Sequence, residues 1–136
     1  MSLIRLIEFN EIGDNRGKLV SLEGNKNIPF EIKRIYYIFN TSEGVSRGFH
    51  AHKNLQQVAI CLSGKCRFTL DDGFSREKVV LESPNVGLYI DNNKWREMDE
   101  FSEDCVLLVI ASDVYNEDDY IRNYDEFKLK INKQRL

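Results

Sequence analysis

Short runs of alternating apolar and polar residues, separated by turn-forming residues, dominate this sequence. Seven runs are rich in β-branched and aromatic residues, as is typical of strands: 18–22, 32–39, 58–62, 66–70, 78–81, 87–90 and 105–111. Between them, Gly, Asn, Asp, Ser or Pro permits sharp turns, at 14–17, 63–64, 71–73, 83–85 and 91–93. This spacing predicts an all-β sandwich or barrel.

The stretch from 116 to 136 differs from the rest because it is strongly charged and lacks strand alternation. We expect it to hold the end of a strand and then a short helix or tail. No linker or repeat divides the chain. A length of 136 residues suits one core. The sequence therefore predicts a single domain over 1–136 with a charged C-terminal extension at about 116–136.

Charge and hydropathy restrict the partners. The chain has 19 basic and 22 acidic residues, a formal net charge of -3, which suits neither nucleic acid nor an anionic membrane surface. Charges interrupt the N-terminal apolar residues too often for a secretory signal, and the longest apolar run, 105–111, is too short to span a bilayer. We expect a cytoplasmic protein that binds a small ligand or a protein partner.

Three cysteines, Cys61, Cys66 and Cys105, are an odd number without C-x-x-C spacing. Neither a disulfide framework nor a zinc site is indicated. If residues 63–64 form a two-residue hairpin turn, Cys61 and Cys66 face each other across strands and a redox pair becomes an alternative. Buried thiols that pack as small apolar residues are the favoured interpretation.

Both histidines of the chain lie in one short segment, Arg47-Gly48-Phe49-His50-Ala51-His52. In a strand, side chains two positions apart share a face, so His50 and His52 project into the same space. The structural alternative is a pair of half-buried polar residues satisfied by hydrogen bonds. Two histidines on one face favour a functional site.

The spacing around the histidines fits the first sequence motif of the cupin fold, at Gly44, His50, His52, Gln57 and Gly64. However, Gln57 stands where that motif has glutamate, and Ile90 stands where the second motif has histidine. Two histidines and a neutral amide form a poor site for a divalent metal, so we expect no metal. Without a metal, a histidine with a pKa near its usual value of about 6.5 suits proton transfer.

Longer segments resemble the sugar-nucleotide 3,4-ketoisomerases, which are related to the dTDP-4-keto-rhamnose 3,5-epimerases. The resembling segments are 14–19, 28–39, 47–53, 71–73 and 95–98. The resemblance implies a cupin jelly roll or β-barrel. It also implies conversion of dTDP-4-keto-6-deoxy-D-glucose to a dTDP-3-keto-6-deoxyhexose through an enediol, with no cofactor. Such a reaction belongs to deoxysugar synthesis for lipopolysaccharide or S-layer glycans.

The same resemblance implies residue roles. His50 would be the base at C3 and His52 a proton relay, with Tyr36 in acid–base work and Arg96 beside the sugar, where it would stabilise the enediolate. Strand alternation places Tyr36 on one face with positions 34 and 38. The alternatives are an aromatic wall for Tyr36 and a surface position for Arg96.

Arginines are expected to bind the diphosphate, because guanidinium groups form paired hydrogen bonds with phosphate oxygens. Arg16 and Arg47 match nucleotide-binding positions of the related epimerases, and Arg34 is a weaker third candidate. The resemblance implies a homodimer. The N-terminal strand that carries Arg16 would add to the neighbour's sheet, with exchange between the two copies.

Other functions compete with isomerisation. The same fold would serve a non-catalytic sugar-nucleotide-binding protein, because a fold does not determine function. Epimerisation at C3 or C5 of the same keto sugar begins with the same proton abstraction. The second histidine, His52, separates the two reactions only weakly. A metal-dependent oxygenase is the least favoured alternative, because two of its ligands are missing at Gln57 and Ile90.

Overall fold

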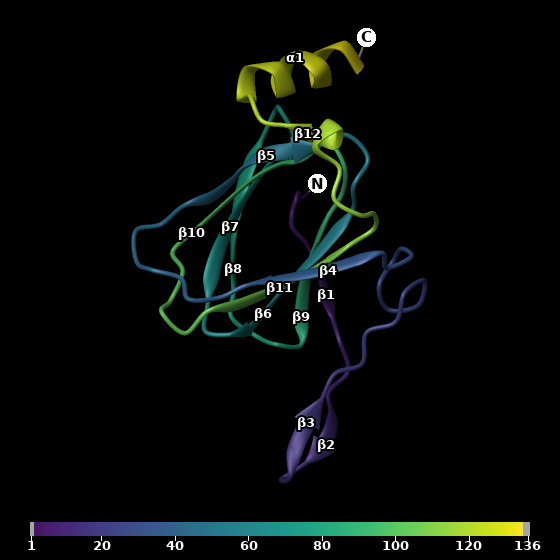
Figure 1. Cartoon of the computed structure of the whole chain (residues 1–136), viewed down its shortest axis with the longest axis vertical. Coiled ribbons are helices and arrows are strands. Elements are labelled where there is room, and N and C mark those ends of the chain that lie inside the picture. Colours follow the sequence, from purple (N-terminus) through teal and green to yellow (C-terminus); the bar gives the residue numbers. More distant parts are fainter. Residues whose placement is uncertain (1, 135–136) are drawn as a thin grey trace.

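The computed structural model describes residues 2–134, which form two five-stranded antiparallel sheets, a small hairpin and one α-helix (Figure 1). The first sheet has the order β1 (Arg5–Glu8), β9 (Val86–Ile90), β6 (Gln57–Ser63), β11 (Val106–Ala111) and β4 (Arg34–Ile38). The second has the order β12 (Tyr120–Ile121), β5 (Arg47–His52), β10 (Trp95–Asp99), β7 (Cys66–Asp71) and β8 (Arg76–Leu81). The predicted all-β architecture is confirmed, and within residues 2–134 the two sheets form an open sandwich rather than a closed barrel. The interpretation of 1–136 as one domain stays a prediction.

The main core lies between the two sheets. Inward side chains alternate along each strand, as with Ala59 and Cys61 in β6 and with Phe68 and Leu70 in β7. A second cluster covers the other face of the first sheet, where Val58 and its neighbours meet the segment around residues 28–30. Burial on both faces explains why β6 and β11 are almost continuously apolar.

Every predicted run overlaps a strand, and at least one end of each run differs from the strand by one or more residues. In β4 the predicted alternation is confirmed, because Tyr36 and Ile38 face the sandwich interior whereas Ile35 and Tyr37 are exposed. The predicted runs did not include β1, β2, β5, β10 and β12, although the histidines of β5 are predicted to lie on a strand. These strands are short or interrupted by charges, so their apolar alternation is weak.

An N-terminal hairpin of β2 (Ile12–Asp14) and β3 (Gly17–Leu19) extends away from the sandwich (Figure 1). Its apolar side chains Ile12 and Leu19 are 60% and 57% exposed. Arg16 lies in its turn and donates to Asp14 at 2.8 Å. In this chain the N-terminal β1 pairs with β9, so the hairpin is the part of the N-terminus left to pair elsewhere.

The charged C-terminal stretch follows its prediction of a strand end and a short helix. A single 3-10 turn, η1 (Glu117–Asp119), leads into β12, which pairs with β5. The helix α1 (Tyr124–Gln134) then buries Phe127 and Ile131 against Trp95. In the part of the chain that the structure describes, no helix has both the length and the apolar character needed to cross a bilayer.

The hairpin considered for Cys61 and Cys66 is wrong, because β6 and β7 belong to different sheets. Residues 63–65 carry the chain from one sheet to the other, and Gly64 adopts φ of 68° there. A Cβ atom at Gly64 would lie 2.9 Å from the Cys105 backbone, so the crossing is tight. The three cysteines still meet in the core, as free thiols.

Candidate active site

A bulge in β5 sets the direction of the histidine side chains. Gly48 and Phe49 have φ of 90° and 60°, and the pairing between β5 and β10 shifts register opposite them. A Cβ atom at Gly48 would lie 2.9 Å from the carbonyl oxygen of Arg96, so glycine is required there. After the bulge, His50 and His52 point into the same region, with ring centroids 4.9 Å apart. The predicted pairing of the two histidines is confirmed.

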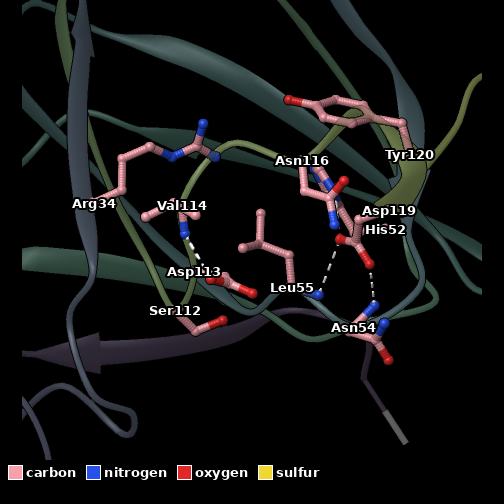
Figure 2. Close-up of a pocket in the computed structure, with 10 residues that line it drawn as sticks. All are labelled: Arg34, His52, Asn54, Leu55, Ser112, Asp113, Val114, Asn116, Asp119 and Tyr120. Atoms are coloured by element: carbon pink, nitrogen blue, oxygen red, sulfur yellow. Dashed lines mark hydrogen bonds and ion pairs between the residues drawn. The ribbon is translucent and has the colours of Figure 1, made fainter.

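Asp119 holds His52 in one orientation. Nδ1 of His52 lies 3.1 Å from Oδ2 of Asp119, and the same carboxylate accepts backbone N–H bonds from Asn54 and Leu55 (Figure 2). A carboxylate only accepts, so Nδ1 carries the hydrogen and Nε2 carries the lone pair. His52 is 1% exposed, and its Nε2 has no hydrogen-bond partner among the described residues.

Tyr120 forms a wall beside both histidines. Its ring centroid lies 4.4 Å from that of His52 and 4.9 Å from that of His50. On β12, Tyr120 is paired with His52 of β5, and the Arg122 guanidinium carbon lies 4.2 Å from the centre of its ring. The C-terminal segment therefore completes the histidine site.

Arg96 is a buried cation at the bottom of the site. It is 2% exposed, and it donates from Nη1 to Oε1 of Gln57 at 2.5 Å and from Nη2 to the carbonyl of Lys94 at 2.9 Å. Within residues 2–134 no carboxylate forms an ion pair with Arg96, and burial lowers its pKa to about 10. The surface position considered for Arg96 is wrong, and a charge without a counter-ion favours an anionic ligand.

Burial and the charge of Arg96 lower the pKa values of both histidines. Burial, and then the charge of Arg96, lowers the pKa of His50 to about 4 and that of His52 to about 2. The sequence suggested a pKa near 6.5, but it did not place a buried guanidinium beside the rings. Both imidazoles are therefore neutral at pH 7, and each has a lone pair to accept a proton.

Four buried polar atoms of the site lack partners among the described residues: Nε of Arg34, Nδ1 of His50, Nε2 of His52 and Nε of Arg96. An unpaired buried polar group costs roughly 1–3 kcal/mol. Such groups are uncommon in folded proteins and mark places where a ligand or water belongs. Their concentration around the histidines indicates a polar ligand.

A cavity of about 440 Å³ opens at the mouth of the sandwich, and Arg34, Tyr36, Arg47, His50 and Tyr120 line it together with Ile38, Gly48, Met98 and Arg122. Beneath it a small recess, also lined by Tyr36 and His50, reaches Arg96 and Gln57. A second hollow of about 100 Å³ lies behind Arg34 and Tyr120 and reaches His52 and Asp119 (Figure 2). Six of the seven candidate residues thus lie around one site.

Arg16 is the exception, because within a single chain it lies on the projecting hairpin and lines none of these cavities. Sequence reasoning also missed Asp119, Tyr120 and Arg122. They lie in the charged segment 116–136, where no motif separated them from surface charges. Only the pairing of β12 with β5 reveals their position.

The cysteines form the other cluster of potential ligands in the described chain. The Sγ atoms of Cys61, Cys66 and Cys105 lie within 4.8 Å of one another, with 3.7 Å between Cys61 and Cys105. Apolar core residues surround them. The hydrogen bond with Cys61 and burial raise the pKa of Cys66, and burial raises that of Cys105 to about 12. These thiols act as core residues and take no part in the histidine site.

The molecule is thus an open β-sandwich in which two neutral histidines lie beside a buried cation, an arrangement suited to proton transfer. Residues 2–132 match the family "FdtA: WxcM-like, C-terminal", and the chain belongs to it.

Three relatives show the likeness in detail. The chain is 56% identical over 132 residues to the TDP-4-oxo-6-deoxy-alpha-D-glucose-3,4-oxoisomerase of Aneurinibacillus thermoaerophilus, covering 97% of this chain and 95% of that one. The WlaRB TDP-quinovose 3,4-ketoisomerase from Campylobacter jejuni is 53% identical, with a TM-score of 0.90. The match covers 95% of this chain and 99% of that one. A mutant of the QdtA 3,4-ketoisomerase from Thermoanaerobacterium thermosaccharolyticum, in complex with TDP-4-keto-6-deoxyglucose, is 45% identical, with a TM-score of 0.95 and coverage of 100% and 99%.

Proposed function

We propose that this protein is a sugar-nucleotide 3,4-ketoisomerase that converts dTDP-4-keto-6-deoxy-D-glucose to a dTDP-3-keto-6-deoxyhexose. One observation carries the proposal. Two neutral histidines lie with their rings 4.9 Å apart, and one of them shares a recess with a buried guanidinium that has no counter-ion, in a chain 56% identical to a TDP-4-oxo-6-deoxyglucose 3,4-oxoisomerase. We place it in the cytoplasm, in deoxysugar synthesis for cell-surface glycans.

His50 begins the reaction at C3. The C4 carbonyl acidifies the C3 hydrogen, and the neutral imidazole removes it as a proton. The electron pair of the C3–H bond forms a C3=C4 double bond, and the carbonyl pair moves to the C4 oxygen. An enediolate results, and its charge lies near Arg96 in the recess that His50 and Arg96 share. The guanidinium stabilises this charge at low dielectric.

His52 moves the proton between the two sugar oxygens. Its Nε2 takes the proton of the C3 hydroxyl and returns it to the C4 oxygen, while Asp119 keeps the hydrogen on Nδ1. The protonated His50 then delivers a proton to C4, which returns the imidazole to its neutral form and leaves the ketone at C3. Atoms and charges balance without an oxidant or a metal ion.

Cations at the mouth bind the diphosphate. Arg34 and Arg47 line the cavity there, and planar guanidinium groups bind phosphate oxygens through paired hydrogen bonds. The negative nucleotide also opposes the electrostatic effect of Arg96 on the histidines. Binding of the substrate therefore raises the pKa of His50 toward the range in which a base acts best.

Two copies of the chain would complete the nucleotide site. β4 is an edge strand of the first sheet. Ile35 and Tyr37 on its outer side are 56% and 62% exposed, and Phe39 just after it is 57% exposed. The projecting hairpin of a second copy would add to such an edge and carry Arg16 toward the cavity, since Arg34 of β4 lines it. Light scattering at micromolar concentration tests the homodimer, and a monomer would exclude this role for Arg16.

Incubation with dTDP-4-keto-6-deoxyglucose in deuterium oxide tests the function. An isomerase moves the ketone from C4 to C3 and places deuterium at C4, which NMR resolves. An epimerase keeps the ketone at C4 and labels C3 or C5. A binding protein returns unlabelled substrate. The His50→Asn variant is the matched control for label that enters without catalysis.

A further inference from the structure

The buried amide of Gln57 connects two side chains that face the recess. Gln57 is 3% exposed at the start of β6. Its Oε1 accepts from Nη1 of Arg96 at 2.5 Å, and its Nε2 lies 3.1 Å from the hydroxyl oxygen of Tyr36. In the sequence, Gln57 stands where the cupin motif has a glutamate. Its hydrogen bonds suggest a positive role.

The direction of this chain of hydrogen bonds is determined at one end. A guanidinium group donates and cannot accept, so the amide must turn its oxygen toward Arg96. The amide NH₂ group then faces Tyr36 and donates to it. Because the Tyr36 oxygen is the acceptor in this bond, its own hydrogen remains available for another partner.

That hydrogen has its natural partner in the cavity. Tyr36 lines both the mouth and the recess, together with His50. Gln57 is the one hydrogen-bond partner of the Tyr36 hydroxyl among the described residues. Tyr36 is therefore a donor toward a ligand oxygen. Arg96 and Tyr36 then donate into the same recess, as two donors of an oxyanion site do.

We propose that Gln57 is a positioning residue that orients the Tyr36 hydroxyl as a hydrogen-bond donor to the sugar oxygen that becomes negative. The proposal rests on the ketoisomerase function proposed above. It also explains the departure from the metal-binding motif. A glutamate at position 57 would accept from both Arg96 and Tyr36, and the Tyr36 hydrogen would turn away from the substrate.

A double-mutant cycle tests the proposal, with Tyr36→Phe introduced into wild type, Gln57→Glu and Gln57→Met. In wild type, loss of one oxyanion donor should lower kcat by roughly tenfold to a thousandfold with little change in KM. In the Gln57→Met protein, Tyr36→Phe should lower kcat by a similar factor, because the Tyr36 hydroxyl is still able to donate. In Gln57→Glu, Tyr36→Phe should lower kcat by less than about threefold, because the hydrogen is already withdrawn.

If Tyr36→Phe lowered kcat by the same factor in wild type and in Gln57→Glu, the proposal would be overturned. The cycle also tests an alternative, in which Gln57→Glu acts only by neutralising the charge of Arg96. In that case Tyr36→Phe would lower kcat by the same factor in Gln57→Glu as in wild type. Thermal unfolding and TDP binding of each variant report on folding and on an intact nucleotide site.

A second measurement needs no turnover. The hydrogen bond from Gln57 opposes the rise in the Tyr36 pKa that burial causes. Ultraviolet titration of each protein against its Tyr36→Phe partner should therefore give a higher Tyr36 pKa in Gln57→Met than in wild type, and a higher one still in Gln57→Glu. Unchanged values would show that the amide does not donate to Tyr36. If wild type left the keto sugar unchanged, the proposed function would fail while this titration still decided the role of Gln57.

Discussion

The two ends of β6 both carry buried groups of potential chemical use, but they differ in how these groups are satisfied. At the start of β6, Gln57 contacts Arg96 in a site with four unpaired buried polar atoms. Toward its end, Cys61 meets two other thiols among apolar side chains. Burial alone therefore does not identify a site. Polar atoms and a cation left without partners do so, because a ligand or an ordered water relieves their cost.

The largest effect is expected from His50→Asn at the histidine end. Removal of the base should lower kcat by about two to four orders of magnitude. TDP binding, measured by calorimetry, should stay near wild type, because the arginines of the mouth provide the nucleotide contacts. Near-normal turnover in this variant would show that His50 is not the base.

Arg96→Met should have the next largest effect, because it removes the cation that stabilises the enediolate in the proposed mechanism. We expect kcat to fall by roughly two to three orders of magnitude in steady-state assays, with a smaller change in KM. Loss of the charge should also raise the pKa of His50, for which Arg96 is the second cause of lowering after burial. A kcat within a few-fold of wild type would mean that the cation is structural.

Asp119→Asn tests the hydrogen bond that orients His52. The amide side chain is also able to donate, so the hydrogen is no longer confined to Nδ1 of His52. Because a relay is less demanding than the base step, kcat should fall by roughly one to two orders of magnitude. The double variant His50→Asn/Asp119→Asn should then have a kcat close to that of His50→Asn alone. If the two losses in kcat multiplied fully, the two residues would act independently.

Acid should destabilise the histidine end. The pKa of His50 is about 4 and that of His52 about 2 in the folded chain, against about 6.5 when unfolded. Between pH 6.5 and 4 the unfolded state binds more protons, so stability falls as the pH falls. From pH 7 to 5 each histidine should remove roughly 1–2 kcal/mol from the free energy of unfolding. Urea titrations at several pH values should show a weaker pH dependence of the free energy of unfolding in His50→Asn than in wild type. The same pH dependence in both proteins would contradict these pKa values.

The smallest effect on activity is expected at the cysteine end. Cys105→Ala should keep kcat and KM within about twofold of wild type, because the thiols lie outside the site. The lost packing should lower stability by about 1 kcal/mol. A large loss of kcat in this variant, with its melting temperature nearly unchanged, would give the thiols a part in function and remove the contrast between the two ends.

Much of this site was accessible from the sequence because strand alternation is a local rule. It placed His50 with His52 and turned Tyr36 inward. The rule failed where contacts join distant segments. Asp119 and Tyr120 lie in a charged stretch with no pattern of their own, and β12 brings them to β5. The depressed histidine pKa values likewise depend on Arg96, which a different strand supplies.

The unpaired atoms around Arg96 also tie the lifetime of the protein to its ligand. A folded chain that leaves these groups unsatisfied becomes more stable when a sugar nucleotide satisfies them, because the ligand binds the folded state and not the unfolded one. A ligand at about 100 times its Kd adds about 2.7 kcal/mol to the free energy of unfolding. Chains without ligand unfold more often and are degraded sooner. We therefore expect the abundance of the enzyme in a cell to rise with the supply of its substrate, without any change in gene expression.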